Sequence, residues 1–401
     1  MSPLHVLLVA SALVLQSAGP DRVTLVEGGQ VLEGRVVFEG VDDIVVRIDR
    51  KDQRIARKDI AQIRSLERSL ATIVERDIPN ADAATLQALA KECEQAGLAA
   101  EAKNLWLRVL ALDPVNDAAV QGAGARRVGK DVKVALGRDQ RNASALAQPQ
   151  PSFKKAYEIE TTHFVVRSDV PLVQALDLAL ALERFHQRFY AVLGAPLELY
   201  VFDDAPQLYV YGRKEDFPAA PEEGASIWFA PAISRVHVNA AMNPSVASIV
   251  HEVTQMMMST ALRRSAGATA QLPLWTAEGI AQVFAVAAPR ERFGAWNEPG
   301  APDGVAFATA SMADVALERV FDASPRDFVG ETKSQSIQAC AYTLVHYLVF
   351  GENGALRAGF GKFLREGTRG KVSLNGLSQA LARPAKEIES GWRAHVEAHA
   401  Q

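Results

Sequence analysis

The chain has 401 residues, enough for two or three domains of ~150 residues each and for a sizeable buried core. Its 43 Lys and Arg against 47 Asp and Glu give a net charge of -4, which excludes the overall basic field of a general nucleic-acid-binding protein. A hydrophobic content of 48% excludes disorder as the dominant state. The 2 cysteines, Cys93 and Cys340, are too few for a disulfide framework or a thiolate zinc cluster, and their apolar surroundings predict buried side chains.

Residues 1–19 have the pattern of a secretory signal peptide. Leu4 to Leu15 form one apolar run that is too short to span a bilayer, and the small residues Ser17, Ala18 and Gly19 follow it. No Lys or Arg precedes the run, which departs from the usual pattern. We expect an exported protein, periplasmic or secreted, that contacts a membrane only through an uncleaved leader.

Residues 21–67 contain short apolar segments separated by Gly and Asp turns. Ile44, Val46 and Ile48 alternate with polar residues, as in a half-buried strand. These segments predict a small, strongly bent antiparallel barrel that loosely resembles Sm-like or SH3-like barrels. We expect this unit to serve in packing or interaction.

Residues 69–117 carry the signature of a helical hairpin. Within 83–116 the apolar spacing, the small residues Ala90 and Ala102 and the closing Pro114 resemble a tetratricopeptide repeat. One such repeat cannot bury both of its faces. We therefore expect the hairpin to dock on its neighbours, with Ser69–Ile78 as a partner helix.

Residues 118–156 are rich in Lys and Arg, with several Gly residues and a stretch of Ala, Gln and Pro. This composition predicts a basic linker with a short strand or hairpin at Val128–Val134. A nucleic-acid-binding patch is the alternative, but Phe153 is the only aromatic residue within this segment, which favours a solvated linker.

Residues 157–401 predict an α+β domain that is mostly helical with a small mixed sheet. The expected strands are His163–Ser168 and Leu197–Phe202, with a helix at Val173–Leu193 between them, followed by a hairpin of Ala225–Phe229 and Arg235–Asn239. The expected helices are Ser245–Arg264, Leu274–Ala287, Ser334–Phe350, Arg357–Glu366 and Leu374–His399, the last with a break at Pro384.

The helix expected at 245–264 contains His251, Glu252 and, four residues after the histidine, Gln255. In the H-E-x-x-H pattern two histidines one helical turn apart bind one zinc ion, and the Glu between them activates a metal-bound water. Here the first His and the Glu are present, while the second His position is occupied by Gln255.

A second motif follows in the sequence Trp275-Thr276-Ala277-Glu278-Gly279-Ile280-Ala281. The paired motifs resemble the gluzincin metallopeptidases, specifically the peptidase-MA-like domains with an H-E-x-x-H helix and a following W-x-x-E-G-x-A helix. The resemblance covers roughly residues 157–370. It implies that Glu278 is the third zinc ligand and that a hairpin edge before the zinc helix pairs with extended substrate.

Two departures from the family pattern weaken the expected zinc site. Gln255 offers an amide oxygen, a weak ligand beside the imidazole nitrogen that zinc favours. One lost ligand removes ~3 kcal/mol of binding free energy, on the order of a hundredfold in affinity. Gln282 stands where many gluzincins carry a carboxylate that orients a ligand His, and such losses cost a further ~10–100-fold. We expect zinc to be bound weakly or to be absent.

Other residues around the motif have two interpretations each. The resemblance implies that Tyr342 or His346, which share a helix face, could stabilise an oxyanion, and His237 on the hairpin is another candidate. Packed or surface histidines are the simpler interpretation. Met256, Met257 and Met258 are expected to fill the core.

We expect His251, Glu252 and Glu278 to converge in one cleft, and three functions are compatible with them. The preferred hypothesis is a pseudopeptidase that binds a peptide or protein ligand. The alternative is an active zinc metallopeptidase with Glu252 as general base, His251 and Glu278 as ligands, and Gln255 or a water in the third position. A metal-free hydrolase with Glu252 and His251 as an acid/base pair ranks last, because no G-x-S-x-G nucleophile motif is visible.

Overall fold

The computed structural model describes residues 20–400 apart from 77–80, 137–138, 203, 221–223, 267–271, 290–295, 329–332 and 368–371. The expected signal peptide, residues 1–19, lies outside the described residues. The protein is a mixed α+β structure with several small sheets, as the sequence predicted at this coarse level.

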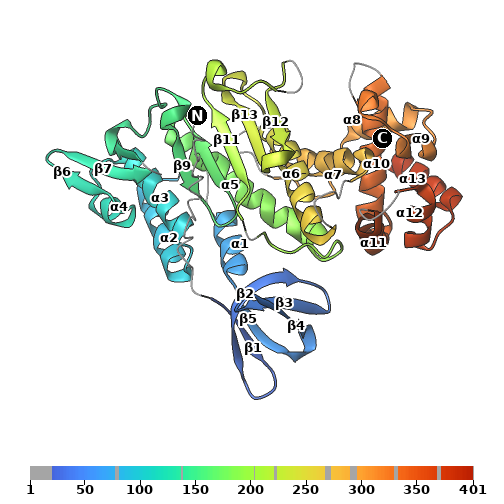
Figure 1. The fold of residues 1–401 in the computed structure, drawn as a ribbon, viewed down its shortest axis with the longest axis horizontal. Helices are drawn as coiled ribbons and strands as arrows, with labels where there is room; N and C mark the ends of the chain where they lie inside the picture. Colours follow the sequence, from blue (N-terminus) through green and yellow to red (C-terminus); the bar gives the residue numbers. More distant parts are fainter. Residues whose placement is uncertain are drawn as a thin grey trace, which may run out of the picture.

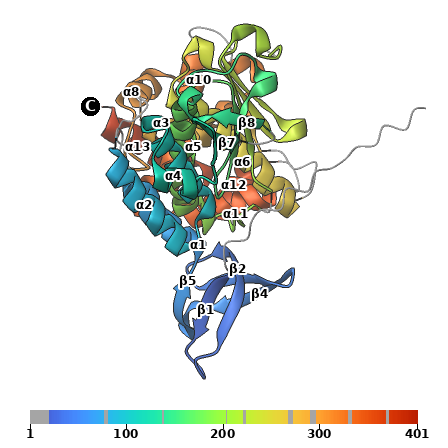
Figure 2. The same ribbon diagram turned by 90° about the vertical axis from the view of Figure 1, so that its left-hand side faces the viewer.

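The N-terminal unit is a five-stranded antiparallel sheet that protrudes from the rest of the molecule (Figures 1 and 2). Its strands are β1 (Asp21–Leu25), β2 (Val31–Glu39), β3 (Asp43–Ile48), β4 (Lys51–Ala56) and β5 (Ile60–Arg64). Their order is β4-β3-β2-β1-β5. One face buries a small core of Val23, Val36, Ile44, Val46 and Ile55.

The expected closed barrel is wrong. Closure requires a ladder between the two outer strands, and among the described residues β4 and β5 pair only with β3 and β1. A register shift in β2 between Val36 and Phe38 bends the sheet, and the short turn Arg57–Asp59 carries the chain from one outer strand to the other. The result is a bent sheet whose edges remain unpaired with each other.

A helical hairpin follows, as predicted from the repeat-like spacing. The helices of this region are α1 (Leu66–Arg76), α2 (Ala83–Ala96), α3 (Ala99–Leu112) and the short α4 (Asp117–Gly122). Gly97 ends α2 in the left-handed conformation, with φ at 79°, which suits a residue that lacks a Cβ. Cys93 and Cys340 are both buried free thiols, as expected.

The segment expected to be a basic linker contains a small sheet of its own. Its three strands are β6 (Arg126–Val128), β7 (Asp131–Leu136) and β8 (Asp139–Asn142), in that order. Val132, Val134 and Leu136 on β7 are buried in the main core. Ordered structure in this segment therefore extends beyond the single short hairpin that its composition indicated.

The central sheet has the order β12-β13-β11-β10-β9 and contains both parallel and antiparallel pairs. The strands are β9 (Tyr157–Glu160), β10 (Val165–Ser168), β11 (Gln207–Tyr211), β12 (Ile227–Ala230) and β13 (Arg235–Asn239). The long helices α5 (Leu172–Phe189) and α6 (Val246–Ala266) contact the sheet and each other. The strand β12 lies at one edge of this sheet, beside α6.

The strand expected at Leu197–Phe202 does not form. Glu198 adopts a left-handed conformation, with φ at 52°, so the backbone turns inside the apolar run. Val201 N donates to Val37 O on β2, and the Tyr200 ring stacks on Phe38. The apolar residues therefore join the central domain to the N-terminal sheet, and the parallel partner of β10 is β11 instead.

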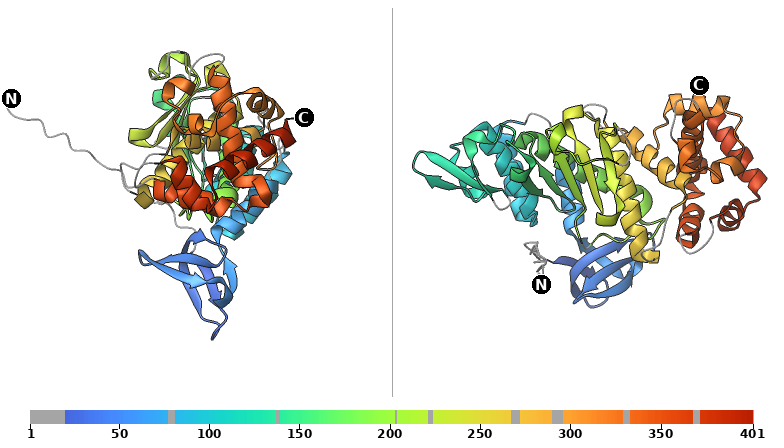
Figure 3. Two further views of the ribbon diagram at one scale, coloured as in Figure 1. Left: turned by 90° about the vertical axis from the view of Figure 1, so that its right-hand side faces the viewer. Right: turned by 45° about the horizontal axis from the view of Figure 1, so that its top comes forward.

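The C-terminal helices gather at the end of the molecule opposite to β6–β8 (Figure 3). They are α7 (Leu274–Ala287), α8 (Gly304–Met312), α9 (Leu317–Phe321), α10 (Lys333–Phe350), α11 (Arg357–Gly367), α12 (Leu374–Leu381) and α13 (Ala385–His399). The buried helix α10 contacts α7, α8, α11 and α13. The short helices α8 and α9 were not predicted, because neither offers a long apolar period. Within the described part of the chain, no helix has the length and apolarity needed to cross a bilayer.

Candidate functional site

The helix α6 carries the first motif, and its two faces differ in burial. Val250, Val253 and the methionines 256–258 are 0–1% exposed and pack into the core, which confirms the core-filling prediction for the methionines. His251 and Gln255, one helical turn apart, lie together on a less buried face.

The helix α7 carries the second motif and lies between α6 and α10. Gly279 makes this packing possible, since a Cβ at that position would lie 2.5 Å from Ala341 O and 2.6 Å from a Val345 methyl carbon. The neighbouring Glu278 is thereby held against α6. The Gly of the W-x-x-E-G motif thus has a direct packing role.

His251, Gln255 and Glu278 meet in one polar cluster. Nε2 of His251 lies 3.2 Å from Oε2 of Glu278, and Nε2 of Gln255 donates to Oε1 of Glu278 at 2.9 Å. The two nitrogens themselves are 3.2 Å apart. Both oxygens of the Glu278 carboxylate are therefore engaged by the two side chains of α6.

The charge environment favours the protonated form of His251. Burial by itself would lower the pKa of this imidazole. The hydrogen bond to Glu278 and the charges of Glu278 and Glu252 outweigh burial and raise the pKa above its usual value. A protonated Nε2 donates to Glu278, so this carboxylate accepts one hydrogen bond from His251 and one from Gln255.

Glu252 points to the edge of the sheet. Its Oε2 accepts a hydrogen bond from Phe229 N on β12 at 3.1 Å. Phe229 belongs to β12, the outermost strand among the described residues, so this carboxylate satisfies a backbone donor on the sheet edge. Glu252 therefore connects α6 to the strand edge beside it.

Two cavities adjoin the cluster. One of about 910 Å³ is lined by His251, Glu252 and Gln282 together with the start of β12 and the 302–305 segment. The other, of about 400 Å³, is lined by His251, Glu278 and Gln282 and by Tyr342 from α10. The polar cluster is thus accessible from two sides, and the larger cavity has the size of a ligand site.

The other predicted residues separate in space. Tyr342 lines the smaller cavity, and its hydroxyl oxygen accepts from Asp303 N at 3.0 Å, while burial raises the pKa of the phenol. His346 is buried one turn further along α10, where its ring nitrogens contact Gly300 O and His395 at 2.9 Å each. Burial lowers the pKa of His346 to about 4. His346 is therefore a packed histidine, in agreement with the simpler interpretation.

His237 also belongs to the fold rather than to the cluster. It lies on the face of β13 opposite to the core residues Val236 and Val238. Its Nδ1 contacts the Tyr211 hydroxyl at 2.9 Å, and its ring stacks on Trp228 with centroids 4.7 Å apart. Burial and then the charge of Arg235 lower its pKa to about 4.

The donor set at the cluster does not match a zinc site of the H-E-x-x-H type. Such a site uses nitrogen or carboxylate donors, and the third donor here is a carboxamide. The nitrogen of Gln255, which has no lone pair available for a metal, faces Glu278 and His251. Two of three strong ligands are present, and the third position is filled by a hydrogen-bond donor.

No protein-family model, no curated protein and no solved structure matches this chain.

Sequence reasoning missed a second group of metal-type donors, Glu67, His163 and His186, which lie close together in the interior. They come from three separate segments, and no motif spacing in the sequence links them.

Proposed function

We propose that residues 157–401 form a degenerate relative of the gluzincin peptidases that binds a peptide or protein ligand without hydrolysing it. The observation that carries the proposal is the hydrogen bond of Gln255 Nε2 to Glu278 Oε1 at 2.9 Å. A peptidase of this type needs that carboxylate for its metal. Here the carboxylate of Glu278 is instead engaged by His251 and Gln255 of α6. The domain retains the cleft and lacks a third strong ligand.

The edge strand β12 supports binding of an extended segment. It borders the cavity of about 910 Å³, and an unpaired strand edge is a template for main-chain hydrogen bonds with a peptide. Glu252 engages one backbone donor of this edge, at Phe229. A bound segment would therefore pair with the remaining edge groups, and its side chains would reach the cavity.

The rest of the chain fits a binding role outside the cell. The N-terminal sheet and the α2–α3 hairpin offer further interaction surfaces, and the leader-like residues 1–19 support export. The low net charge of -4 favours a protein or peptide ligand over a nucleic acid.

The alternative is an active zinc metallopeptidase, favoured by one observation. His251 and Glu252 line the same cavity, and Glu278 contacts His251. In that case Glu252 would serve as general base. Its present engagement with Phe229 N would then have to break, because a general base must reach the water that it activates.

Metal content and proteolysis decide between the two functions. We expect no zinc at His251 and Glu278 in protein purified without chelator, and no cleavage of a mixed peptide library. The matched control is the Glu252→Ala variant, whose hydrolysis should equal that of the parent protein. Zinc-dependent cleavage that is lost in Glu252→Ala would overturn the pseudopeptidase proposal.

A further inference from the structure

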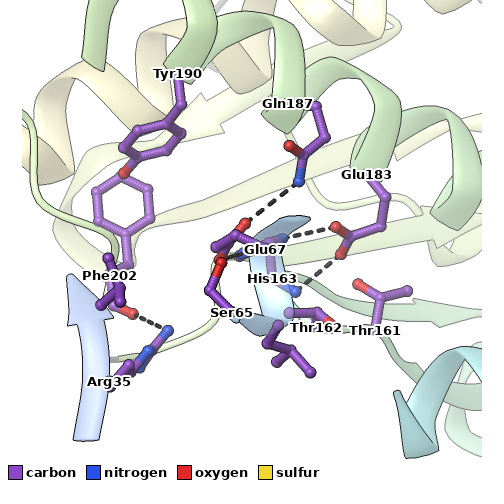
Figure 4. A network of polar contacts seen from close by, with 12 residues as sticks. Arg35, Ser65, Glu67, Thr161, Thr162, His163, Glu183, Gln187, Tyr190 and Phe202 are labelled. Atoms are coloured by element: carbon purple, nitrogen blue, oxygen red, sulfur yellow. Dashed lines mark hydrogen bonds and ion pairs between the residues drawn. The ribbon is translucent and has the colours of Figure 1, made fainter. Parts of the chain in front are cut away.

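The structure contains a cluster of potential ligands far in sequence from the candidate site. Figure 4 shows two of its members, Glu67 and His163, with the supporting residues Glu183 and Gln187. Glu67 lies in the first turn of α1, His163 lies in the connection between β9 and β10, and His186 lies on α5. Each offers one donor atom, and these atoms all lie within 4.8 Å of one another. The three segments therefore meet where α1 packs on the central domain.

His186 is the member of the cluster that the protein leaves unsatisfied. The residue is 2% exposed, and neither of its ring nitrogens has a hydrogen-bond partner in the described structure. Its ring stacks on His163, with centroids 3.4 Å apart and planes 13° apart. A buried imidazole without a partner is costly, and a metal ion would use its free lone pair.

His163 is held between two carboxylates, one at each ring nitrogen. Its Nδ1 contacts Glu183 Oε2 at 2.7 Å, and its backbone N donates to Glu183 Oε1 at 2.8 Å. A carboxylate on one ring nitrogen fixes the ring so that the other nitrogen, Nε2, faces a metal. That Nε2 lies 2.6 Å from Oε1 of Glu67.

Glu67 is supported in a similar way. Its second oxygen, Oε2, accepts a hydrogen bond from Gln187 Nε2 at 3.3 Å, which leaves Oε1 directed at His163. The cluster thus contains three donors and two supporting side chains, Glu183 and Gln187, both from α5.

We propose that Glu67, His163 and His186 bind one divalent transition-metal ion of the zinc class. Two imidazoles and one carboxylate suit zinc, while magnesium and calcium prefer oxygen ligands alone. The ion would take the place of the direct contact between Glu67 and His163. Since the ligands come from α1, the β9–β10 connection and α5, the ion would tie α1 to the central domain.

The test uses the full chain stripped of metal with a chelator and titrated with Zn²⁺ in a calorimeter. We expect one equivalent to bind and the melting temperature to rise with Zn²⁺, because a ligand specific for the folded state stabilises it. Co²⁺ in the same position would give visible absorption bands, a readout independent of any activity.

Three variants locate the ion. Glu67→Gln and His186→Phe keep the size and shape of the side chains, and each should weaken Zn²⁺ binding by at least about 100-fold. The control His251→Asn alters the candidate site and should bind Zn²⁺ as the parent protein does. If His186→Phe does not fold, Glu67→Gln still provides the test, because the Glu67 side chain is partly exposed and its substitution disturbs the core less.

The outcomes separate this inference from the proposed function. A parent protein that binds no Zn²⁺ overturns the inference and leaves the pseudopeptidase proposal standing. Zn²⁺ binding that is lost only in His251→Asn overturns both. Binding lost in Glu67→Gln and retained in His251→Asn supports the buried site.

Discussion

The side-chain nitrogen of Gln255 lies 2.9 Å from Oε1 of Glu278, across the interface between α6 and α7. In an H-E-x-x-H site the corresponding side chain would be a histidine that shares a metal with this carboxylate. Here the two groups bind each other directly. The side chain at position 255 therefore links α6 to α7 through a hydrogen bond.

Restoring the histidine should restore metal binding. In Gln255→His the new imidazole lies one helical turn from His251 and faces Glu278, which completes three strong ligands. We expect Zn²⁺ affinity at this site to rise about 100-fold. The measurement is Zn²⁺ titration in a Glu67→Gln background, which removes the buried cluster. Gln255→Asn is the control, and equal binding by both variants would contradict the role assigned to position 255.

Glu252 should stabilise the edge strand rather than catalyse a reaction. In Glu252→Ala the Phe229 amide loses its acceptor, so its hydrogen exchange should accelerate about 5-fold, the equivalent of ~1 kcal/mol. Glu252→Gln keeps an acceptor oxygen and should exchange nearly as slowly as the parent. Unchanged protection in the Ala variant would show that this hydrogen bond does not hold the strand.

Gly279 should be intolerant of any side chain. A Cβ there would meet the backbone of α10 at 2.5 Å, so Gly279→Ala should lower the free energy of unfolding by about 1–3 kcal/mol despite the better helix propensity of Ala. Gly304, also in a helix, has open space around it, and a Cβ added there would meet no atom within 4 Å. Gly304→Ala is therefore the control and should be neutral or stabilising in urea unfolding.

His346 should make the protein sensitive to acid. Its pKa is about 4 in the folded protein and 6.5 in an unfolded chain, so between these values the unfolded state binds more protons. The contribution of His346 to the free energy of unfolding is therefore complete above pH 6.5. It is lost as the pH falls towards 4, with a slope of at most about 1.4 kcal/mol per pH unit. His395, which contacts His346, has a pKa of about 4 as well and acts in the same direction.

The check is urea unfolding from pH 7 to pH 4. His346→Phe should be less stable at pH 7, because Gly300 O loses its partner, and should lose less stability on acidification. A variant with the same pH slope as the parent protein would rule out His346 as a source of the acid sensitivity.

Local patterns predicted many of the elements. Apolar periodicity located α6, α7, α10 and the β12–β13 hairpin, since a helix or hairpin depends mainly on residues within a few turns of each other. The resemblance of the paired motifs led us to expect His251, Glu252 and Glu278 in one cleft. The structure brings His251 and Glu278 into contact, together with Gln255.

Local patterns failed where long-range contacts decide. The apolar run at 197–202 has strand composition, yet Val201 and Tyr200 pack on β2 from a different part of the chain. Barrel closure likewise depends on whether β4 and β5 meet, which no residue within either strand specifies.

By itself, the sequence determined that His251, Glu252 and Gln255 lie on one helix at the spacing of an H-E-x-x-H motif, because that spacing lies within about one turn of helix. Only the tertiary structure decided what the Gln255 amide does, namely bind Glu278, and that Glu67, His163 and His186 share a point in the interior. Glu67 and His186 meet because α1 packs on α5. Residues so distant in sequence form no local periodic pattern from which their contact could be predicted.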